Sequence, residues 1–64
     1  MKAKYVKIAL ILENARDTKD RRKKVCKVVG TYRTENGIEY RRGFNFPKGA
    51  NIQKIKLPEF IYVM

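Results

Sequence analysis

VCKVVGTYRTENGIEYRRGFNF, residues 25–46, is the stretch of the chain that decides the fold. Two runs rich in β-branched and aromatic residues flank Asn36-Gly37, a pair typical of the type I′ turn, because that turn needs a positive φ at both central residues. A two-residue loop at this point sets the register of the strands and pairs Arg33 with Tyr40. The sequence therefore predicts an antiparallel hairpin centred on Asn36-Gly37.

A second β-rich run, KYVKIALILE from Lys4 to Glu13, precedes the hairpin. Its content of Val, Ile and Tyr favours a strand. A helix is the alternative for residues 5–15, because four apolar residues follow the i, i+3, i+4, i+7 spacing of an amphipathic helix: Ile8, Ile11, Leu12 and Ala15.

Turn residues and short apolar runs follow the hairpin, beginning with the turn-forming segment Pro47 to Asn51. Ile52 to Leu57 and Glu59 to Val63 are predicted as one or two short strands, interrupted at Pro58, which cannot donate to a ladder. A single helical turn around Asn51 to Lys54 is the alternative at the start of this part. The apolar end of the chain is expected to close the sheet or, alternatively, to dock on a partner protein.

These segments define a fold class. A chain of 64 residues forms a single domain, residues 1–64, because two domains of half that size would each be too small to bury a core. Four or five short strands are also too few for an ordinary two-sheet sandwich. We predict a mainly β fold: a small barrel or strongly bent antiparallel sheet of four or five strands, SH3-like or OB-like, with a central hairpin and a long basic loop.

The strongest compositional feature is charge, with 16 Lys and Arg against 6 Asp and Glu and a net charge of +10. Such an excess costs self-repulsion in the folded state and favours a polyanionic partner. The excess peaks in the loop predicted from Asn14 to Lys24, where six cations are candidates for phosphate contacts: Arg16, Lys19, Arg21, Arg22, Lys23 and Lys24. The alternatives are a solvated loop whose charges aid solubility and a nuclear localisation signal at Arg21 to Lys24.

The predicted hairpin is the second candidate site. Its register places Arg33, Tyr40 and Arg42 on one face and Arg41 on the other. Aromatic rings interleaved with Arg suit a nucleic-acid platform, because the rings stack on bases while the cations hold phosphates. The alternative is that Tyr40 belongs to the core and that the Arg stems lie along it.

The residue inventory argues against catalysis. The chain has no His and no Ser, and its carboxylates and glycines are scattered, so it offers no catalytic triad and no phosphate-binding glycine motif. The single Cys26 forms no intramolecular disulfide and no Cys-rich metal site. We therefore expect neither an enzyme nor a cofactor or metal. The longest apolar run, Ile8 to Leu12, is too short to span a bilayer, which favours a cytoplasmic protein without a membrane partner.

In size and composition the chain resembles the small basic β-barrel proteins of archaea that coat DNA or sit on the ribosome. The lack of Ser and His also leans towards a thermophile. The sequence predicts a non-catalytic protein that binds structured RNA through phosphate contacts, as a small ribosomal or ribosome-associated component in contact with ribosomal proteins. The alternatives are a chromatin-type protein on duplex DNA, associated with the nucleoid, and an adaptor that binds an acidic protein.

Overall fold

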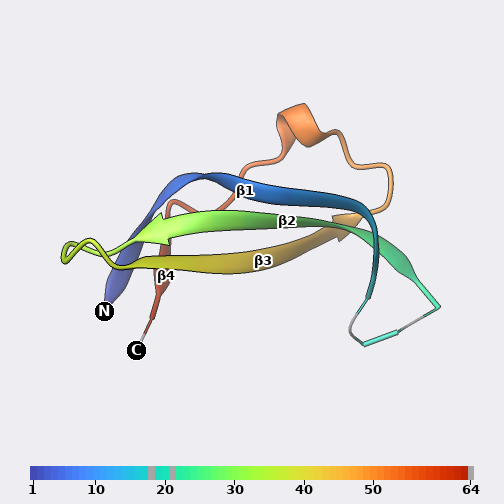
Figure 1. Cartoon of the computed structure of the whole chain (residues 1–64). Coiled ribbons are helices and arrows are strands. Elements are labelled where there is room, and N and C mark those ends of the chain that lie inside the picture. Colours follow the sequence, from blue (N-terminus) through green and yellow to red (C-terminus); the bar gives the residue numbers. More distant parts are fainter. Residues whose placement is uncertain (18, 21, 64) are drawn as a thin grey trace.

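The structure is a computed structural model that describes residues 1–17, 19, 20 and 22–63. It contains the strands β1 (Lys2–Arg16), β2 (Lys24–Arg33), β3 (Glu39–Pro47) and β4 (Phe60–Tyr62), with a 3-10 turn, η1 (Ile52–Lys54), between β3 and β4. The strands form one antiparallel sheet in the order β3-β2-β1-β4 (Figure 1). Among the described residues, no helix is long and apolar enough to cross a membrane.

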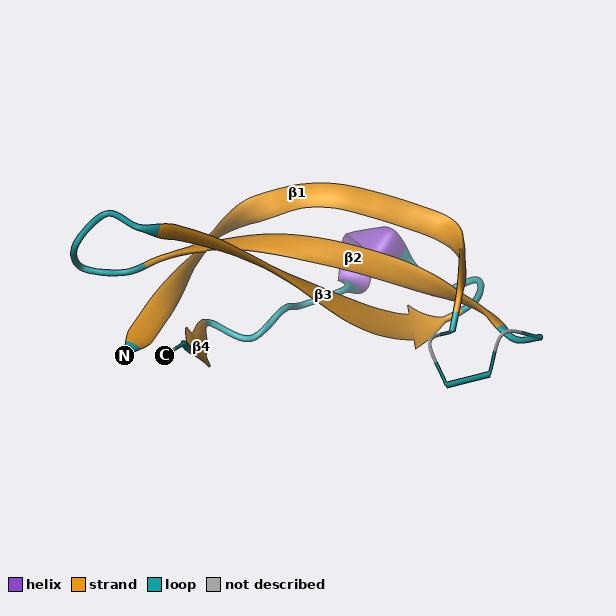
Figure 2. Ribbon diagram, turned by 60° about the horizontal axis from the view of Figure 1, so that its bottom comes forward, coloured by secondary structure: helices purple, strands orange, loops and turns teal. Residues whose placement is uncertain are grey.

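The N-terminal run is a strand, as its β-branched residues predict, and the helical alternative for residues 5–15 is wrong. β1 is longer than its neighbour: the twelve residues from Tyr5 to Arg16 lie opposite the nine from Lys24 to Tyr32. The register shifts at three places along β1 absorb the extra residues. Such irregularities bend a strand, and β1 arches over β2 (Figure 2).

The predicted hairpin is present, but its register is wrong by one residue. Arg33 pairs with Glu39 instead of Tyr40. The amide of Gly37 donates to the carbonyl of Thr34 at 3.0 Å, and Gly37 alone in this loop has a positive φ, of 83°. This is a three-residue loop with a left-handed glycine, not a type I′ turn, which would also need a positive φ at Asn36. A slip of one residue moves every side chain of one strand to the other face.

The core lies on one face of the sheet, which we call the core face. Its centre is Tyr32, which is fully buried, and Ala3, Ile61 and Val63 are buried around it. The hydroxyl of Tyr32 donates to the carbonyl of Pro58 at 2.7 Å, which ties β2 to the segment before β4. Burial raises the pKa of the Tyr32 hydroxyl above its ordinary value.

The segment between β3 and β4 covers this core face (Figure 2). It passes so close to β2 that a Cβ atom on Gly30 would lie 2.7 Å from Cδ1 of Leu57. Its one helical turn, η1, is the turn considered for Asn51 to Lys54, and the side chain of Asn51 caps it by accepting from the amide of Gln53 at 3.0 Å.

The predicted barrel is wrong, as is the strongly bent sheet. In the described residues, β3 and β4 are the two edges of an open sheet and do not pair with each other. β4 has three residues and pairs only with Lys2–Lys4. Residues 52–57, predicted as a strand, form η1 and an irregular segment. They cover the core face instead of extending the sheet, so the edges stay apart.

Candidate nucleic-acid interface

The sheet has a second face, opposite the core, which we call the open face. Side chains alternate between the two faces of a strand, and the pairings assign the open-face residues. They include Lys2, Lys4, Lys7, Leu10 and Leu12 of β1, Lys27, Val29, Thr31 and Arg33 of β2, Glu39, Arg41, Gly43 and Asn45 of β3, and Phe60 and Tyr62 of β4. Because the segment after β3 packs on the core face, most of these side chains are exposed.

One end of the open face combines cations with aromatic rings. Phe60, Lys4 and Arg33 form one row across β4, β1 and β2. Lys7 and Arg41 lie on the next row, with the buried Thr31 between them, and Lys2 pairs with Tyr62 on the row before. We call this set the aromatic–cation patch: Lys2, Lys4, Lys7, Arg33, Arg41, Phe60 and Tyr62.

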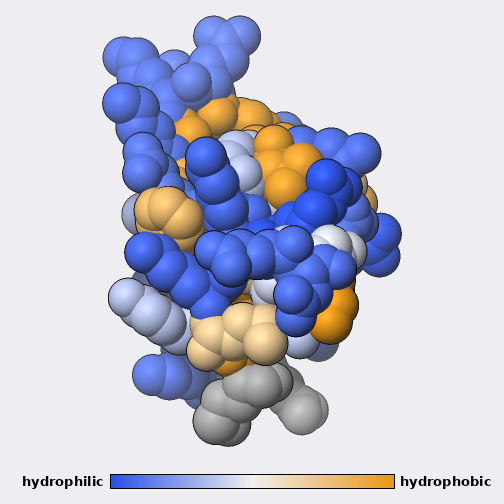
Figure 3. Space-filling view, turned by 90° about the vertical axis from the view of Figure 1, so that its left-hand side faces the viewer, coloured by the Kyte–Doolittle hydropathy of each residue, from blue (hydrophilic) through white to orange (hydrophobic). Residues whose placement is uncertain are grey.

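The two rings of the patch are accessible from solvent. Tyr62 is 76% exposed and Phe60 is 40% exposed. The Nζ atom of Lys2 lies 4.1 Å from the centroid of the Phe60 ring, a cation–π contact that holds charge and ring together. Seen from this end of the molecule, the surface is mainly hydrophilic, with smaller apolar areas between the polar side chains (Figure 3).

Glu39, which pairs with Arg33 on the open face, reports the electrostatic environment of the patch. Arg33 donates a hydrogen bond to Glu39 and forms an ion pair with it. This bond and the charge of Arg33 lower the pKa of Glu39, and Lys7 and Arg41 lower it further. A carboxylate held in its ionised form by three cations reports a positive local potential, which would equally favour a phosphate.

The basic loop lies at the other end of the sheet (Figure 1). Arg16 and Lys24 are the last and first residues of β1 and β2 and pair with each other, so the loop is shorter than predicted. The carboxylate of Asp17 accepts from the amide of Lys19 at 2.9 Å.

The carboxylate of Asp20, like that of Asp17, accepts a hydrogen bond from the backbone amide two residues later, that of Arg22, at 3.0 Å. Neither Asp17 nor Asp20 forms an ion pair with a cation that the structure describes, and Lys19, Arg22, Lys23 and Lys24 are exposed. Arg21 lies outside the described residues. The loop is therefore a cationic surface without an aromatic ring.

The structure separates the residues that the predicted register grouped. Arg33 and Arg41 lie on the open face, whereas Tyr40 and Arg42 lie on the core face. Tyr40 is half-buried against the core, which agrees with the alternative interpretation that it is a core residue. Arg42 is exposed beside it. The predicted grouping of Arg33, Tyr40 and Arg42 is wrong because the loop has three residues instead of two.

Five members of the patch were missed by sequence reasoning: Lys2, Lys4, Lys7, Phe60 and Tyr62. The signal was an alternation of period two at both ends of the chain. Ala3 is buried between two lysines, and Ile61 is buried between two aromatic residues. Only the pairing of β1 with β4 brings these two ends together.

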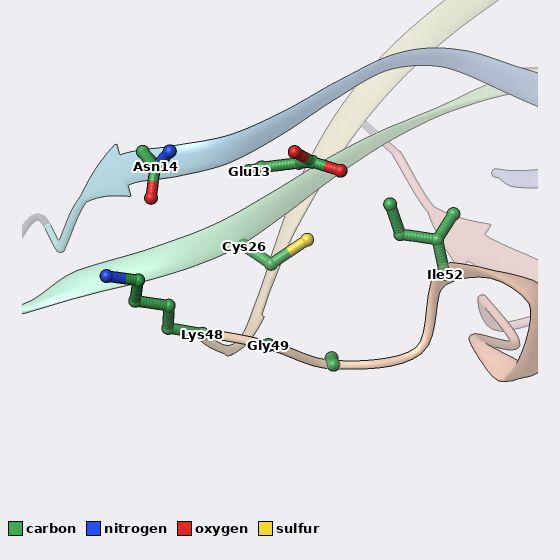
Figure 4. A pocket seen from close by; sticks show the side chains of 7 residues that line it. Glu13, Asn14, Cys26, Lys48, Gly49 and Ile52 are labelled. Carbon is green, nitrogen blue, oxygen red and sulfur yellow. The ribbon is translucent and has the colours of Figure 1, made fainter.

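A shallow cavity of about 250 Å³ lies on the other side of the sheet, beside Cys26 (Figure 4). It is lined by Glu13, Asn14, Cys26, Lys48, Gly49, Ala50 and Ile52. Cys26 is buried. Within the described residues, no three His, Cys, Asp or Glu side chains gather as metal ligands would.

Comparisons with known proteins gave no match: no family model, no curated protein and no solved structure is significantly similar to this chain.

Proposed function

We propose that this chain is a non-catalytic nucleic-acid-binding protein that binds RNA through the open face of its sheet. The observation that carries the proposal is the aromatic–cation patch, where Phe60 and Tyr62 are exposed among five cations on paired strands. Exposed aromatic rings that lie together on one surface, rimmed by polar residues, mark an interaction site, whereas singly exposed apolar residues need no such explanation. In RNA binding the rings would stack on bases, and the surrounding cations would hold phosphates.

RNA is favoured over duplex DNA by the shape of the surface. Rings on an open sheet can stack only on bases that are not already stacked in a helix, and structured RNA presents such bases in its loops and bulges. The basic loop supplies a second contact at the far end of a molecule whose Cα atoms span 39 Å. A protein with a cationic site at each end of its sheet suits a folded RNA with several segments, as in a ribosomal or ribosome-associated particle.

Duplex DNA is the second candidate, and one observation favours it. Ile38 lies in the β2–β3 hairpin loop, directly before Glu39, and its side chain is 49% exposed. An apolar side chain beside cations can enter the minor groove as a wedge between base steps.

Fluorescence anisotropy with a labelled RNA hairpin and a labelled DNA duplex of equal length tests the proposal. We expect tighter binding to the RNA hairpin. Lys4→Glu should weaken this binding and lower the salt slope by about 1, since Lys4 lies in the centre of the patch. Glu39→Gln should strengthen binding, because it removes the carboxylate that pairs with Arg33.

Lys54→Glu is the matched control, because Lys54 is exposed on η1 and away from the open face. It changes the net charge as Lys4→Glu does. An equal loss of affinity in the two variants would show that net charge alone drives binding, and would refute a role for the patch. Binding that does not respond to salt would refute the nucleic-acid proposal itself.

A further inference from the structure

The aromatic–cation patch and the basic loop are joined by the middle of the open face. Two rows of side chains lie there, and we call them the central strip: Leu10, Val29 and Gly43 in one row, and Leu12, Lys27 and Asn45 in the next. β2 has 10 residues from Lys24 at the loop to Arg33 in the patch, so it spans about 30 Å. The central strip occupies the middle of this distance.

The central strip is apolar and accessible. Leu10 is 51% exposed and Leu12 is 43% exposed. A Cβ atom on Gly43 would lie 2.7 Å from Cε of Lys27, so the stem of Lys27 lies across β3 where the glycine leaves room for it. Apolar side chains that gather on a surface with polar groups around them mark an interaction site. The interaction surface therefore continues beyond the patch.

The charges along the central strip favour an anionic partner. Lys27 forms no ion pair with a carboxylate that the structure describes. Glu39 lies at the patch end of the face, where it pairs with Arg33. Glu13 follows the strip in the chain, but it lines the cavity on the other side of the sheet (Figure 4). No described carboxylate therefore opposes the charge of Lys27 in the middle of the open face.

A small hollow of about 200 Å³ connects the central strip to the basic loop. It is lined by Asp17, Lys23, Val25, Asn45, Phe46 and Pro47. Asn45 belongs to the strip and Lys23 to the loop. Lys23 is exposed, whereas Asp17 is half-buried and its carboxylate accepts from the amide of Lys19. Cations therefore follow one another from the patch through Lys27 to the loop.

We infer that one unpaired RNA segment lies along the strands over the central strip, from the aromatic–cation patch to the basic loop; this rests on the proposed function. An unpaired strand can turn its bases towards the leucines and its phosphates towards Lys27 and the cations at both ends. A duplex carries its phosphates on the outside and would press them against Leu10 and Leu12, where they would lose water without gaining a partner. The substrate class is therefore single-stranded RNA, such as the unpaired part of a folded RNA.

The length of the sheet sets the footprint of this strand. At the 3.4 Å per nucleotide of a stacked strand, about nine nucleotides cover 30 Å, and a more extended strand needs fewer. A strand of about four nucleotides, at the low end of such binding sites, covers only the patch. Affinity should therefore depend on length up to about nine nucleotides.

Fluorescence anisotropy with labelled oligouridylates of about 4 to 12 nucleotides tests the footprint. After correction for the number of binding registers, we expect the affinity to rise up to about nine nucleotides and then to level off. An RNA duplex of about ten base pairs should bind more weakly than the single strand of the same length. Equal corrected affinities of the shortest and longest strands would overturn the inference, and so would a duplex that binds as tightly as the single strand.

Two substitutions in the central strip test the path of the strand. Lys27→Gln should weaken binding of the ten-nucleotide strand by about fivefold and lower its salt slope by about 0.7, because one phosphate contact is lost. Leu10→Glu should weaken it by about tenfold, since it places a carboxylate under the strand. Both should affect the four-nucleotide strand far less. Circular dichroism checks that each variant folds as the wild type does.

Lys54→Gln is the matched control, because it lowers the net charge by one, as the other two variants do, and Lys54 is exposed on η1. If all three variants lose the same affinity, the strand does not cross the central strip and the inference is overturned, while the proposed function stands as long as Lys4→Glu still weakens binding. If no RNA binds, the proposed function fails as well. A change in the sedimentation mass of RNA-free Leu10→Glu, with its RNA affinity unaltered, would assign the strip to contact with a second copy of the chain and overturn the inference.

Discussion

Tyr32 and Tyr62 lie on opposite faces of the same small sheet, and they differ in their burial and in their neighbours. Tyr32 is fully buried on the core face, where its ring meets that of Tyr5 edge-on with centroids 5.7 Å apart. Tyr62 is 76% exposed on the open face, beside Lys2. The core face uses its aromatic residue for stability, whereas the open face presents one to solvent. In a 64-residue chain with one thin core, the exposed ring is the one to explain by function.

The largest expected effect comes from breaking the core face. Tyr32→Ala removes a buried ring and the hydrogen bond to Pro58, which should lower the free energy of unfolding by about 3–5 kcal/mol. In a domain this small, such a loss leaves a large unfolded population. Urea denaturation followed by circular dichroism measures it, and an unfolding free energy within 1 kcal/mol of the wild type would contradict the assigned core.

The matching change on the open face should act on binding and not on stability. Tyr62→Ala should leave the free energy of unfolding within about 0.5 kcal/mol of the wild type. It should cost about 1–3 kcal/mol of RNA-binding free energy if the ring stacks on a base. Anisotropy titrations measure this cost. Tyr62→Phe is the control, because it keeps the ring, and loss of binding in both variants would argue against stacking.

Two glycines extend the comparison to the backbone. In Gly30→Ala the new Cβ would lie 2.7 Å from Leu57 and 3.1 Å from the fixed ring of Tyr32, so overpacking should cost about 1–3 kcal/mol of stability. In Gly43→Ala the close atom is Cε of Lys27, the end of a flexible side chain that can move into solvent. We expect no loss of stability there. Parallel urea melts of the two variants provide the measurement, and equal losses would show that the faces are packed alike.

The smallest effect is a pH dependence of stability in the alkaline range, which comes from Tyr32 on the core face. The pKa of Tyr32 is raised in the folded state above the ordinary value of 10.0, chiefly by burial. The folded state therefore favours the neutral hydroxyl. This stabilisation is complete below pH 10 and is lost as pH rises through the raised pKa. Unfolding free energies measured across this range should fall in the wild type, and Tyr32→Phe should lack this contribution. An identical pH profile for the wild type and Tyr32→Phe would refute this contribution of the Tyr32 hydroxyl.

Much of the secondary structure was predictable from the sequence, because it depends on local chemistry. The β-branched residues of Lys4 to Glu13 form a strand, and Asn36-Gly37 lies in a hairpin loop whose glycine takes the positive φ. The helical turn after Asn51 was an open alternative, since a short polar N-cap competes there with extended backbone.

The candidate site was only partly predictable. Arg33 and Arg41 were predicted as nucleic-acid-binding residues and lie on the open face. The basic loop lies at the end of the β1–β2 pair. Tyr40 was selected as a stacking residue but packs against the core. Phe60 and Tyr62 were interpreted as part of a closing strand, because the period-two alternation around Ile61 does not by itself say which of the two sets of side chains is buried.

The sequence by itself determined the β character of the chain, the position of its central hairpin and its excess of positive charge. These properties depend on side-chain sterics, turn chemistry and composition, each of which acts within a few residues. Only the tertiary structure decided the register of the hairpin, the face on which each cation and ring lies, and the pairing of β4 with the start of β1. The reason is that loops of two and three residues around the same Asn-Gly differ little in local energy, while a one-residue difference exchanges the two faces of a strand. The register that forms is the one that buries the chain's few large apolar side chains.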